Sequence, residues 1–261
     1  MTPPTTSPAE RDSGAGGGSG GLDRAAAILD AFDATHRELT LAELVRRSDL
    51  PRSTVHRTAT TMIKLGWLDK PGERYRIGNK LFEVSGLAPV RHELREAVLP
   101  FLQDLYAATR TTVQLGVLDG ANVLVVDKIT GHRRMPMLSQ VGGRIPAHCS
   151  ALGRAILAFS PAETVNAVLA AGLEPRTSRT TTSPEALRRL LAAIPDQGWA
   201  AEREEGNVGV ACVAAPIFGP LNVIVAAVSV TGPVAGVRVN RMAPAVCLAA
   251  SAASRAYSQR R

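Results

Sequence analysis

The sequence is poor in aromatic residues and in cysteine. Only 4% of its 261 residues are aromatic, and its three cysteines (Cys149, Cys212 and Cys247) are scattered and odd in number. No CxxC pair or Cys/His cluster has the spacing of a zinc site, so no metal is expected. This usage of cysteine fits a reduced, cytoplasmic setting best.

Long apolar runs are also missing. No uninterrupted run reaches the roughly 18–20 residues that a membrane helix needs. The nearest one, Ala211 to Val228, is broken by Pro216, Gly219, Pro220 and Asn222. The first residues lack the apolar core of a signal peptide. We therefore expect neither secretion nor a membrane partner.

What the chain does contain is enough apolar material for two modest domains and an excess of positive charge. Hydrophobic residues make up 45% of the sequence, which excludes wholesale disorder. The 30 Lys and Arg residues outnumber the 23 Asp and Glu residues, giving a net charge of +7. Such a balance favours an anionic partner, with nucleic acid the first candidate.

Composition divides the chain into four regions. In residues 1–21, Gly, Pro, Ser and Thr fill 15 positions, which predicts a disordered tail. We assign residues 22–80 to a first folded domain, 81–90 to a linker helix region and 91–258 to a second, larger domain.

The pattern over residues 22–80 predicts three helices followed by a hairpin. Apolar residues at helical spacing indicate a first helix over 22–32, with Leu22 on its apolar stripe. Thr40 and Glu43 have capping-box spacing and mark the start of a second helix. A third helix is expected over 52–65, and short strands at 67–69 and 74–77 enclose a Lys-Pro-Gly-Glu turn. This succession is typical of a winged helix-turn-helix.

The third helix has the composition of a recognition helix. Its exposed face would carry arginine, which suits guanine, together with short hydroxyl side chains that contact bases or phosphates. From Thr40 to Lys70, 6 Lys and Arg residues face 3 Asp and Glu residues, so the excess charge lies on this module. The predicted DNA contacts are Arg52, Ser53, Thr54, His56, Arg57 and Thr60 on the helix, and Lys70, Arg74 and Arg76 on the wing.

The remainder of the chain predicts an α+β domain with an antiparallel sheet. Strands at 112–118 and 122–128 flank an Asp-Gly turn, and a third strand is expected at 135–139. Helices follow at about 150–159, 161–171 and 184–194, then strands at 199–205, 210–217 and 222–231, and a helix at 238–257. Before them, residues 78–111 are expected to be helical, with Pro100 as a kink or a start.

Several separated stretches resemble the isocitrate lyase regulator (IclR) family of bacterial transcription factors. They are Leu-Thr-Leu-Ala-Glu-Leu (39–44), Leu-Pro-Arg-Ser-Thr-Val-His-Arg (50–57), Leu-Gly-Trp-Leu (65–68), Tyr-Arg-Ile-Gly (75–78) and the segments 141–158, 204–216 and 227–233. The resemblance spans residues 22–258, and it rests on the joint order and spacing of these stretches. Two departures are the Ser-Asp-Leu (48–50) at the helix turn and Arg-Thr-Ala (57–59) in the third helix.

The resemblance implies a winged-helix domain, a linker helix and a GAF-like effector domain. It implies a homodimer or homotetramer that binds double-stranded operator DNA of pseudo-palindromic sequence and a small organic effector, either a carboxylate or an aromatic compound. No cofactor is implied. Matched to the family motif, the effector-binding residues are Met135, Met137, Ile145, Ala151, Leu152, Glu202, Val210, Cys212, Ser229 and Thr231.

Two features of this pocket bear on the effector's charge. A helix that begins near Ser150–Gly153 would direct its first amides at an anion. Glu202 would disfavour an anion, unless it is protonated or paired with Arg203 or Arg144. The sequence leaves this tension open.

Three other interpretations remain. His148 and Cys149 invite a metal site or a Cys/His nucleophile, but adjacent residues on an extended segment point apart, and no third group is visible. The sequence therefore favours a protein that is not an enzyme. The winged helix could instead serve a protein partner in a pure sensor module, or bind DNA without sequence preference.

Overall fold

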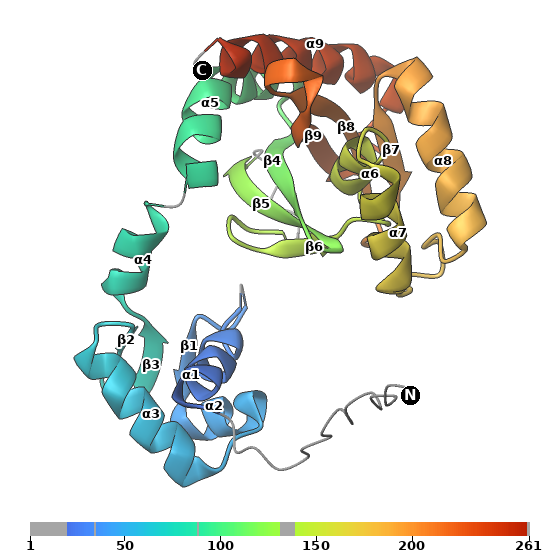
Figure 1. Cartoon of the computed structure of the whole chain (residues 1–261). Helices are drawn as coiled ribbons and strands as arrows, with labels where there is room; N and C mark the ends of the chain where they lie inside the picture. Colours follow the sequence, from blue (N-terminus) through green and yellow to red (C-terminus); the bar gives the residue numbers. More distant parts are fainter. Residues whose placement is uncertain (1–19, 34, 88, 131–138, 260–261) are drawn as a thin grey trace, which may run out of the picture. The chain divides into compact units, whose positions relative to one another are not determined.

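The computed structural model describes residues 20–33, 35–87, 89–130 and 139–259, and over 89–92 the backbone alone. The described residues form two compact units, divided between Ser85 and Gly86 (Figure 1). The predicted tail, except for its last two residues, lies outside the described residues. So do Met135, Met137 and all of the predicted strand at 135–139 except Ser139.

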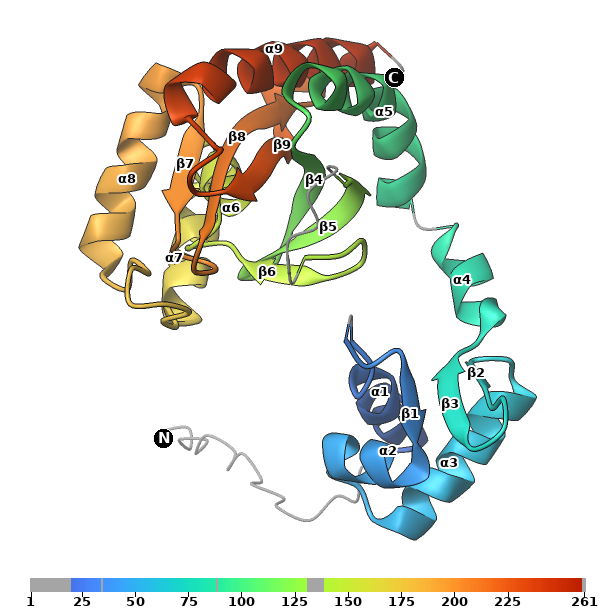
Figure 2. The same ribbon diagram turned by 180° about the vertical axis from the view of Figure 1, so that it is seen from behind.

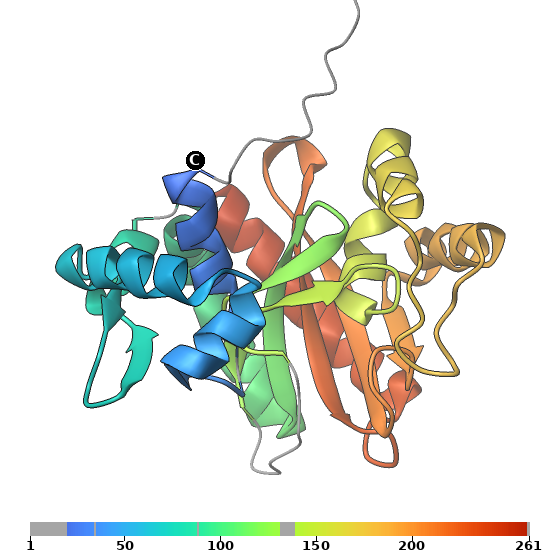
Figure 3. The same ribbon diagram turned by 90° about the horizontal axis from the view of Figure 1, so that it is seen from below.

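The first unit contains four helices and a small sheet within the described residues. Its elements are α1 (Gly21–Asp30), β1 (Glu38–Thr40), α2 (Leu41–Ser48), α3 (Arg52–Lys64), β2 (Leu68–Asp69), β3 (Arg74–Ile77) and α4 (Asn79–Ser85). The strands form an antiparallel sheet in the order β1-β3-β2. Figure 3 shows α1, α2 and α3, in shades of blue, crossing one another, with the teal strands of the wing beside α3.

Local chemistry explains how α2 and α3 meet. Thr40 Oγ1 accepts a hydrogen bond from the Glu43 amide (3.3 Å), and the Glu43 carboxylate accepts one from the Thr40 amide (2.8 Å), which confirms the capping box. Three residues then separate the helices, and Asp49 takes the left-handed conformation (φ 54°) that aspartate tolerates. The inner face of α3 packs against the core through the buried side chains of Val55, Ala59 and Met62.

Two details of this unit differ from the sequence prediction. Strand β1 was not expected, because it is only three residues long and runs directly into the capping box. Leu22 does not belong to the core stripe of α1, since 79% of its surface is exposed. The buried face begins instead at Ala25 and Ile28.

The second unit is a six-stranded antiparallel sheet with helices on both faces (Figures 1 and 2). Its elements are α5 (Pro89–Thr109), β4 (Thr112–Asp119), β5 (Asn122–Ile129), β6 (Arg144–Pro146), α6 (Ala151–Leu157), α7 (Ala162–Ala170), α8 (Pro184–Gln197), β7 (Ala200–Arg203), β8 (Val210–Phe218), a 3-10 turn (Pro220–Asn222), β9 (Ile224–Pro233) and α9 (Val239–Ser258). The strand order is β6-β5-β4-β9-β8-β7.

Alternation along the strands produces two cores, one on each face of the sheet. Val113, Val213 and Val230 point toward α5 and α9 and belong to one apolar cluster. Cys212, Ala214 and Ala227 point the other way and pack with α6, α7 and α8 in a second cluster. The polar residues of β4, β7, β8 and β9 discussed below share this second face, next to α6.

Two predictions for this unit need correction. The edge strand β6 was missed, because it is three residues long and ends in a proline. Of the two alternatives for Pro100, a helix start is wrong, since α5 runs from Pro89 to Thr109 with this proline inside it, whereas the kink stays a prediction. The close approach of α6 to the preceding loop requires Gly153, because a Cβ there would overlap the backbone of Ala147.

Candidate functional site

The outer face of α3 carries a group of exposed polar side chains. Arg52, Ser53, His56, Arg57 and Thr60 are exposed, and Thr54 is half-buried. Among the described residues, neither arginine has an ion-pair or hydrogen-bond partner, whereas the Thr60 hydroxyl donates to the carbonyl of His56 (2.8 Å). The face therefore presents two free guanidinium groups about one and a half turns apart.

The cations of the wing are held by local contacts. Lys70 lies over the ring of Tyr75 (5.4 Å to its centre) and 3.5 Å from the Glu73 carboxylate. Arg74 donates to the carbonyl of Glu38 (3.2 Å), and Arg76 pairs with Asp69 across the strands (3.4 Å). All three remain exposed, so they can exchange these weak surface contacts for phosphates.

The second unit contains a cavity of about 90 Å³ between the sheet and the start of α6. This volume corresponds to about three water molecules or one small organic molecule. Seven of the residues predicted to bind an effector line it: Ile145, Ala151, Leu152, Glu202, Val210, Cys212 and Thr231. Ser229 does not line the cavity, although it lies on the same face of β9 as Thr231. The sequence analysis missed Gln114, Arg144, Cys149 and Arg176, which also line it.

A row of polar side chains crosses the sheet beneath the cavity. Glu202, Cys212 and Thr231 stand opposite one another on β7, β8 and β9. The Cys212 thiol is hydrogen-bonded to the Thr231 hydroxyl, which donates to Gln114 Oε1 (3.2 Å). Gln114 Nε2 in turn donates to the Ser139 hydroxyl (2.6 Å). Next to this row, the fully buried Ser229 hydroxyl has no hydrogen-bond partner among the described residues.

Glu202 is a buried carboxyl group in the wall of the cavity, with 7% of its surface exposed. Its Oε2 accepts hydrogen bonds from the amides of Glu205 (3.0 Å) and Gly206 (3.5 Å). Burial raises the pKa of Glu202 to about 7, and the charge of Glu205 adds to this effect. Of the alternatives that the sequence left open, pairing of Glu202 with Arg144 is not seen, because Arg144 pairs with Asp119 (2.5 Å). Within the described residues, no ion pair joins Arg203 to Glu202 either.

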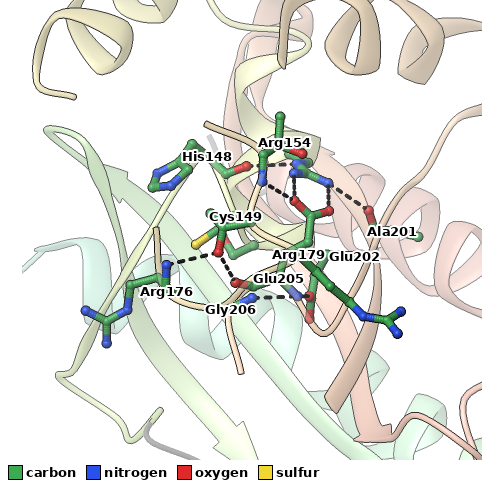
Figure 4. Close-up of polar contacts among 12 residues, drawn as sticks. His148, Cys149, Arg154, Arg176, Arg179, Ala201, Glu202, Glu205 and Gly206 are labelled. Carbon is green, nitrogen blue, oxygen red and sulfur yellow. Dashed lines mark hydrogen bonds and ion pairs between the residues drawn. The ribbon is translucent and has the colours of Figure 1, made fainter. Parts of the chain in front are cut away.

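Beside Glu202, a buried ion pair ties α6 to the sheet and its loops (Figure 4). The Arg154 guanidinium binds both oxygens of Glu205 (2.6 and 2.5 Å), and these side chains are only 3% and 12% exposed. Arg154 also donates to the carbonyl of His148 (2.8 Å), and Glu205 accepts from the amide of Thr181 (3.0 Å). Burial alone would raise the pKa of Glu205, but the bonds from Arg154 hold it below its usual value.

His148 and Cys149 do not form a reactive pair. The His148 ring faces the carbonyl of Glu174 (Nε2 to O, 3.1 Å). Burial raises the pKa of the Cys149 thiol to about 11 and that of Cys212 to about 12, the latter with a contribution from the charge of Glu202. Both groups are therefore thiols at neutral pH, and neither has the lowered pKa of a cysteine nucleophile.

The titration of Glu202 makes the stability of the second unit depend on pH. Because the pKa rises from about 4.5 in the unfolded chain to about 7, the stability contributed by the protonated group is complete below pH 4.5 and is lost as the pH rises through 7. Glu202→Gln keeps the shape without the charge. We expect the free energy of unfolding of this variant to exceed that of the wild type by about 3 kcal/mol near pH 8 and to match it near pH 4.5.

Urea unfolding followed by tryptophan fluorescence measures this difference. Trp67 and Trp199 are the two tryptophans of the chain, so a Trp67→Phe background isolates the second unit. Glu163→Gln, on the exposed start of α7, is the matched control. A stability difference for Glu202→Gln that is the same at both pH values would contradict the assignment.

These features define a class of protein: a helix-turn-helix DNA-binding unit joined to an α+β unit with a small internal cavity. Comparison with known proteins agrees. Residues 21–72 match the IclR helix-turn-helix domain, and residues 88–259 match the bacterial transcriptional regulator IclR C-terminal domain. The chain therefore belongs to the IclR family of transcriptional regulators, whose members are not enzymes.

Curated relatives cover nearly the whole chain. The transcriptional repressor IclR of Escherichia coli (strain K12) is 32% identical over 244 residues, 90% of this chain and 89% of the relative. The regulator BhcR of Paracoccus denitrificans is 34% identical over 240 residues, 90% of this chain and 86% of the relative. The chain is thus a DNA-binding transcriptional regulator that combines both domains of the family.

Solved structures show the same fold. An IclR homologue from Microbacterium hydrocarbonoxydans, complexed with 4-hydroxybenzoate, is 29% identical and superposes with a TM-score of 0.83, covering 92% of this chain and all of that one. The IclR protein of Thermotoga maritima is 28% identical with a TM-score of 0.73, over 91% of this chain and 98% of that one. Within the described residues, no helix is long and apolar enough to cross a bilayer.

Proposed function

We propose that the protein binds a pseudo-palindromic operator as a homodimer or homotetramer and that a small organic carboxylate in the cavity changes this binding. The observation that carries the DNA part is the exposed face of α3, where Arg52 and Arg57 are free of protein partners among the described residues. A recognition helix of this kind enters the major groove, and a two-fold axis of the protein requires a two-fold operator.

The proposed DNA contacts are those of the sequence analysis, on α3 and on the wing. Arg52 and Arg57 have the geometry to bind guanine, while the short polar side chains and the wing cations contact phosphates. Only the arginines would then carry strong base discrimination. This division separates a sequence-specific regulator from a non-specific DNA binder.

The cavity supports the effector part of the proposal. It is lined by both polar and apolar groups, as ligand sites are. The solved homologue with 4-hydroxybenzoate is a protein of this family that holds a carboxylate. We extend that ligand class, though not that compound, to this chain, with Ile145, Ala151, Leu152, Glu202, Val210, Cys212 and Thr231 as contacts and Ser229 next to them on β9.

Retention of genomic DNA tests the DNA part. Fragments of the source genome are incubated with the purified protein at physiological salt and no added ligand, and the retained fragments are sequenced. We expect discrete sites with two-fold symmetry. Retention that is spread evenly over the genome would favour a non-specific binder, and retention without the steep salt dependence of phosphate neutralisation would favour a protein partner.

Substitution of the hydroxyl groups next to the cavity tests the effector part. Thr231→Val removes a hydroxyl that lines the cavity and is expected to weaken effector affinity about tenfold, the value of one hydrogen bond. Ser229→Ala removes the buried hydroxyl without a protein partner and should weaken effector binding while leaving unliganded DNA binding intact. Ser251→Ala, exposed on α9, is the control.

Calorimetry with a carboxylate identified by thermal-shift screening measures these affinities. If both hydroxyl variants bound the effector with unchanged affinity, the hydroxyl groups of β9 would not be part of the effector site. Weaker affinity in the Ser251→Ala control would show that the effect is not local to the cavity.

A further inference from the structure

The wall of the cavity contains fewer available cations than its residues suggest. Arg144 lines it, but its guanidinium pairs with Asp119 through two bonds to one carboxylate oxygen (2.9 and 2.5 Å). Arg154 lies next to Glu202, but its guanidinium already forms a bidentate ion pair with Glu205 and is not available to neutralise a ligand. Arg176 is exposed at the edge of the cavity, so water screens its charge. An anion inside the cavity therefore meets no buried cation that is free to neutralise it among the described residues.

The same wall contains one buried carboxyl group that points at the ligand space. Both amide hydrogen bonds of Glu202 go to Oε2, and no described residue bonds Oε1. Glu202 lines the cavity, and among the described residues Oε1 is its oxygen that is left free for a hydrogen bond to a bound molecule. Figure 4 shows this side chain beside Glu205 and Gly206, on the loop that follows β7.

Because Glu202 lines the cavity, a molecule bound against this part of the wall lies next to its carboxyl group. Two carboxylates at such a distance repel each other strongly where water is excluded. When two acids share a site, one of them keeps its proton, which then bridges the two groups as a strong hydrogen bond. Hence an anion and an ionised Glu202 exclude each other in this cavity.

We propose that the effector is a small anion that binds together with a proton on Glu202, so that Glu202 selects the ligand by donating a hydrogen bond from Oε1. This inference rests on the proposed function in that it assigns the effector to this cavity. It resolves the conflict between a carboxylate ligand and an acidic residue in the wall. It also names Glu202 as the specificity-determining residue of the pocket.

The other groups around Glu202 do not change charge near neutral pH. From β8, Cys212 presents a thiol whose pKa is raised to about 12 by burial, and from the loop before α6, Cys149 presents a thiol whose pKa is raised to about 11. Arg154 from α6 and Glu205 from the loop after β7 are locked as an ion pair. Burial lowers the pKa of His148, whose ring faces the backbone carbonyl of Glu174.

The pKa of Glu202, raised to about 7, makes the proposal measurable. Below pH 7, Glu202 is already protonated in the free protein, so binding of an anion requires no further proton uptake. Above it a proton must be taken up with the anion, and the affinity falls about tenfold for each further pH unit.

Acetate is the test ligand, because it is small enough for the cavity and stays ionised from about pH 5.5 to 8.5, its pKa being close to those of Asp and Glu. Neutral acetamide has nearly the same shape. Dissociation constants are measured on the full-length protein by NMR titration of the amides of Glu205 and Gly206. For the wild type we expect acetate to bind equally well at pH 5.5 and 6 and about tenfold more weakly at pH 8.5 than at 7.5. Acetamide should show no such dependence.

Glu202→Gln supplies a permanent donor in place of the protonated acid. We expect this variant to bind acetate with the affinity of the wild type at low pH, and equally well at pH 8.5. The control variant Glu163→Gln, on the exposed start of α7, should behave as the wild type.

Three outcomes would overturn the proposal. They are acetate binding by the wild type that does not depend on pH, acetate binding lost in a folded Glu202→Gln variant at low pH, and acetamide binding without acetate binding at any pH. None of these measurements involves DNA. A failure here therefore leaves operator binding intact, whereas a failure of genomic retention would not alter the acetate result.

Discussion

Arg154→Ala is expected to destabilise the second unit by about 3–5 kcal/mol, the cost of leaving one member of a buried ion pair alone. Glu205 would keep its burial and lose the guanidinium that neutralises it. The carbonyl of His148 would lose its donor as well. Because Arg154 joins α6 to the loops on either side of the cavity, the loss should also abolish effector binding.

An exposed ion pair of the same unit is the matched control. Arg144 and Asp119 pair at 2.5 Å, but their side chains are 59% and 45% exposed. Water and salt screen such a pair, so Arg144→Ala should cost at most about 1 kcal/mol. Urea unfolding in the Trp67→Phe background compares the two variants through Trp199. Equal losses of stability would contradict the assigned role of the buried pair.

Replacing both Arg52 and Arg57 by alanine is expected to reduce operator affinity by about 30- to 30,000-fold. Each arginine that binds a guanine contributes about 1–3 kcal/mol, and the two contributions add if the contacts are independent. Discrimination between the operator and unrelated DNA should fall in parallel, because base contacts are lost rather than phosphate contacts alone.

Fluorescence anisotropy with a retained fragment and a scrambled duplex, at constant salt, measures this effect. Both arginines are exposed and without protein partners among the described residues, so the double variant should unfold at the wild-type temperature. Arg188→Ala combined with Arg189→Ala, which removes two exposed charges on α8, is the control for net charge. If affinity for both duplexes fell equally, α3 would contact phosphates only, and the base-reading face would lie elsewhere.

Patterns between near neighbours in the chain were the most informative part of the sequence. The Thr40–Glu43 capping box and the left-handed Asp49 define the turn before α3, and the structure shows both. The order of helices and strands in the second unit also follows from periodicity and turn residues. Strands β1 and β6 were missed, because three residues are too few to show alternation and both strands are formed by pairing with distant segments.

The cavity was predictable in part. Residues on the strands and at the start of α6 could be named from the family motif, and seven of them line one cavity. Gln114 was not foreseen, since a single glutamine in an apolar strand has no local signal until β4 is placed beside β9. The Arg154–Glu205 pair joins residues 51 positions apart, so only the fold reveals that it neutralises Glu205 and leaves Glu202 without a cation.

The measurement that tests the central claim most directly is the mutual effect of operator and effector. Operator affinity is determined with and without a saturating carboxylate that binds the cavity, and carboxylate affinity is determined with and without operator. A ligand-responsive regulator requires that each ligand change the affinity of the other by the same factor, typically about 5- to 150-fold. Tight and specific binding of both ligands with no mutual effect would contradict the account.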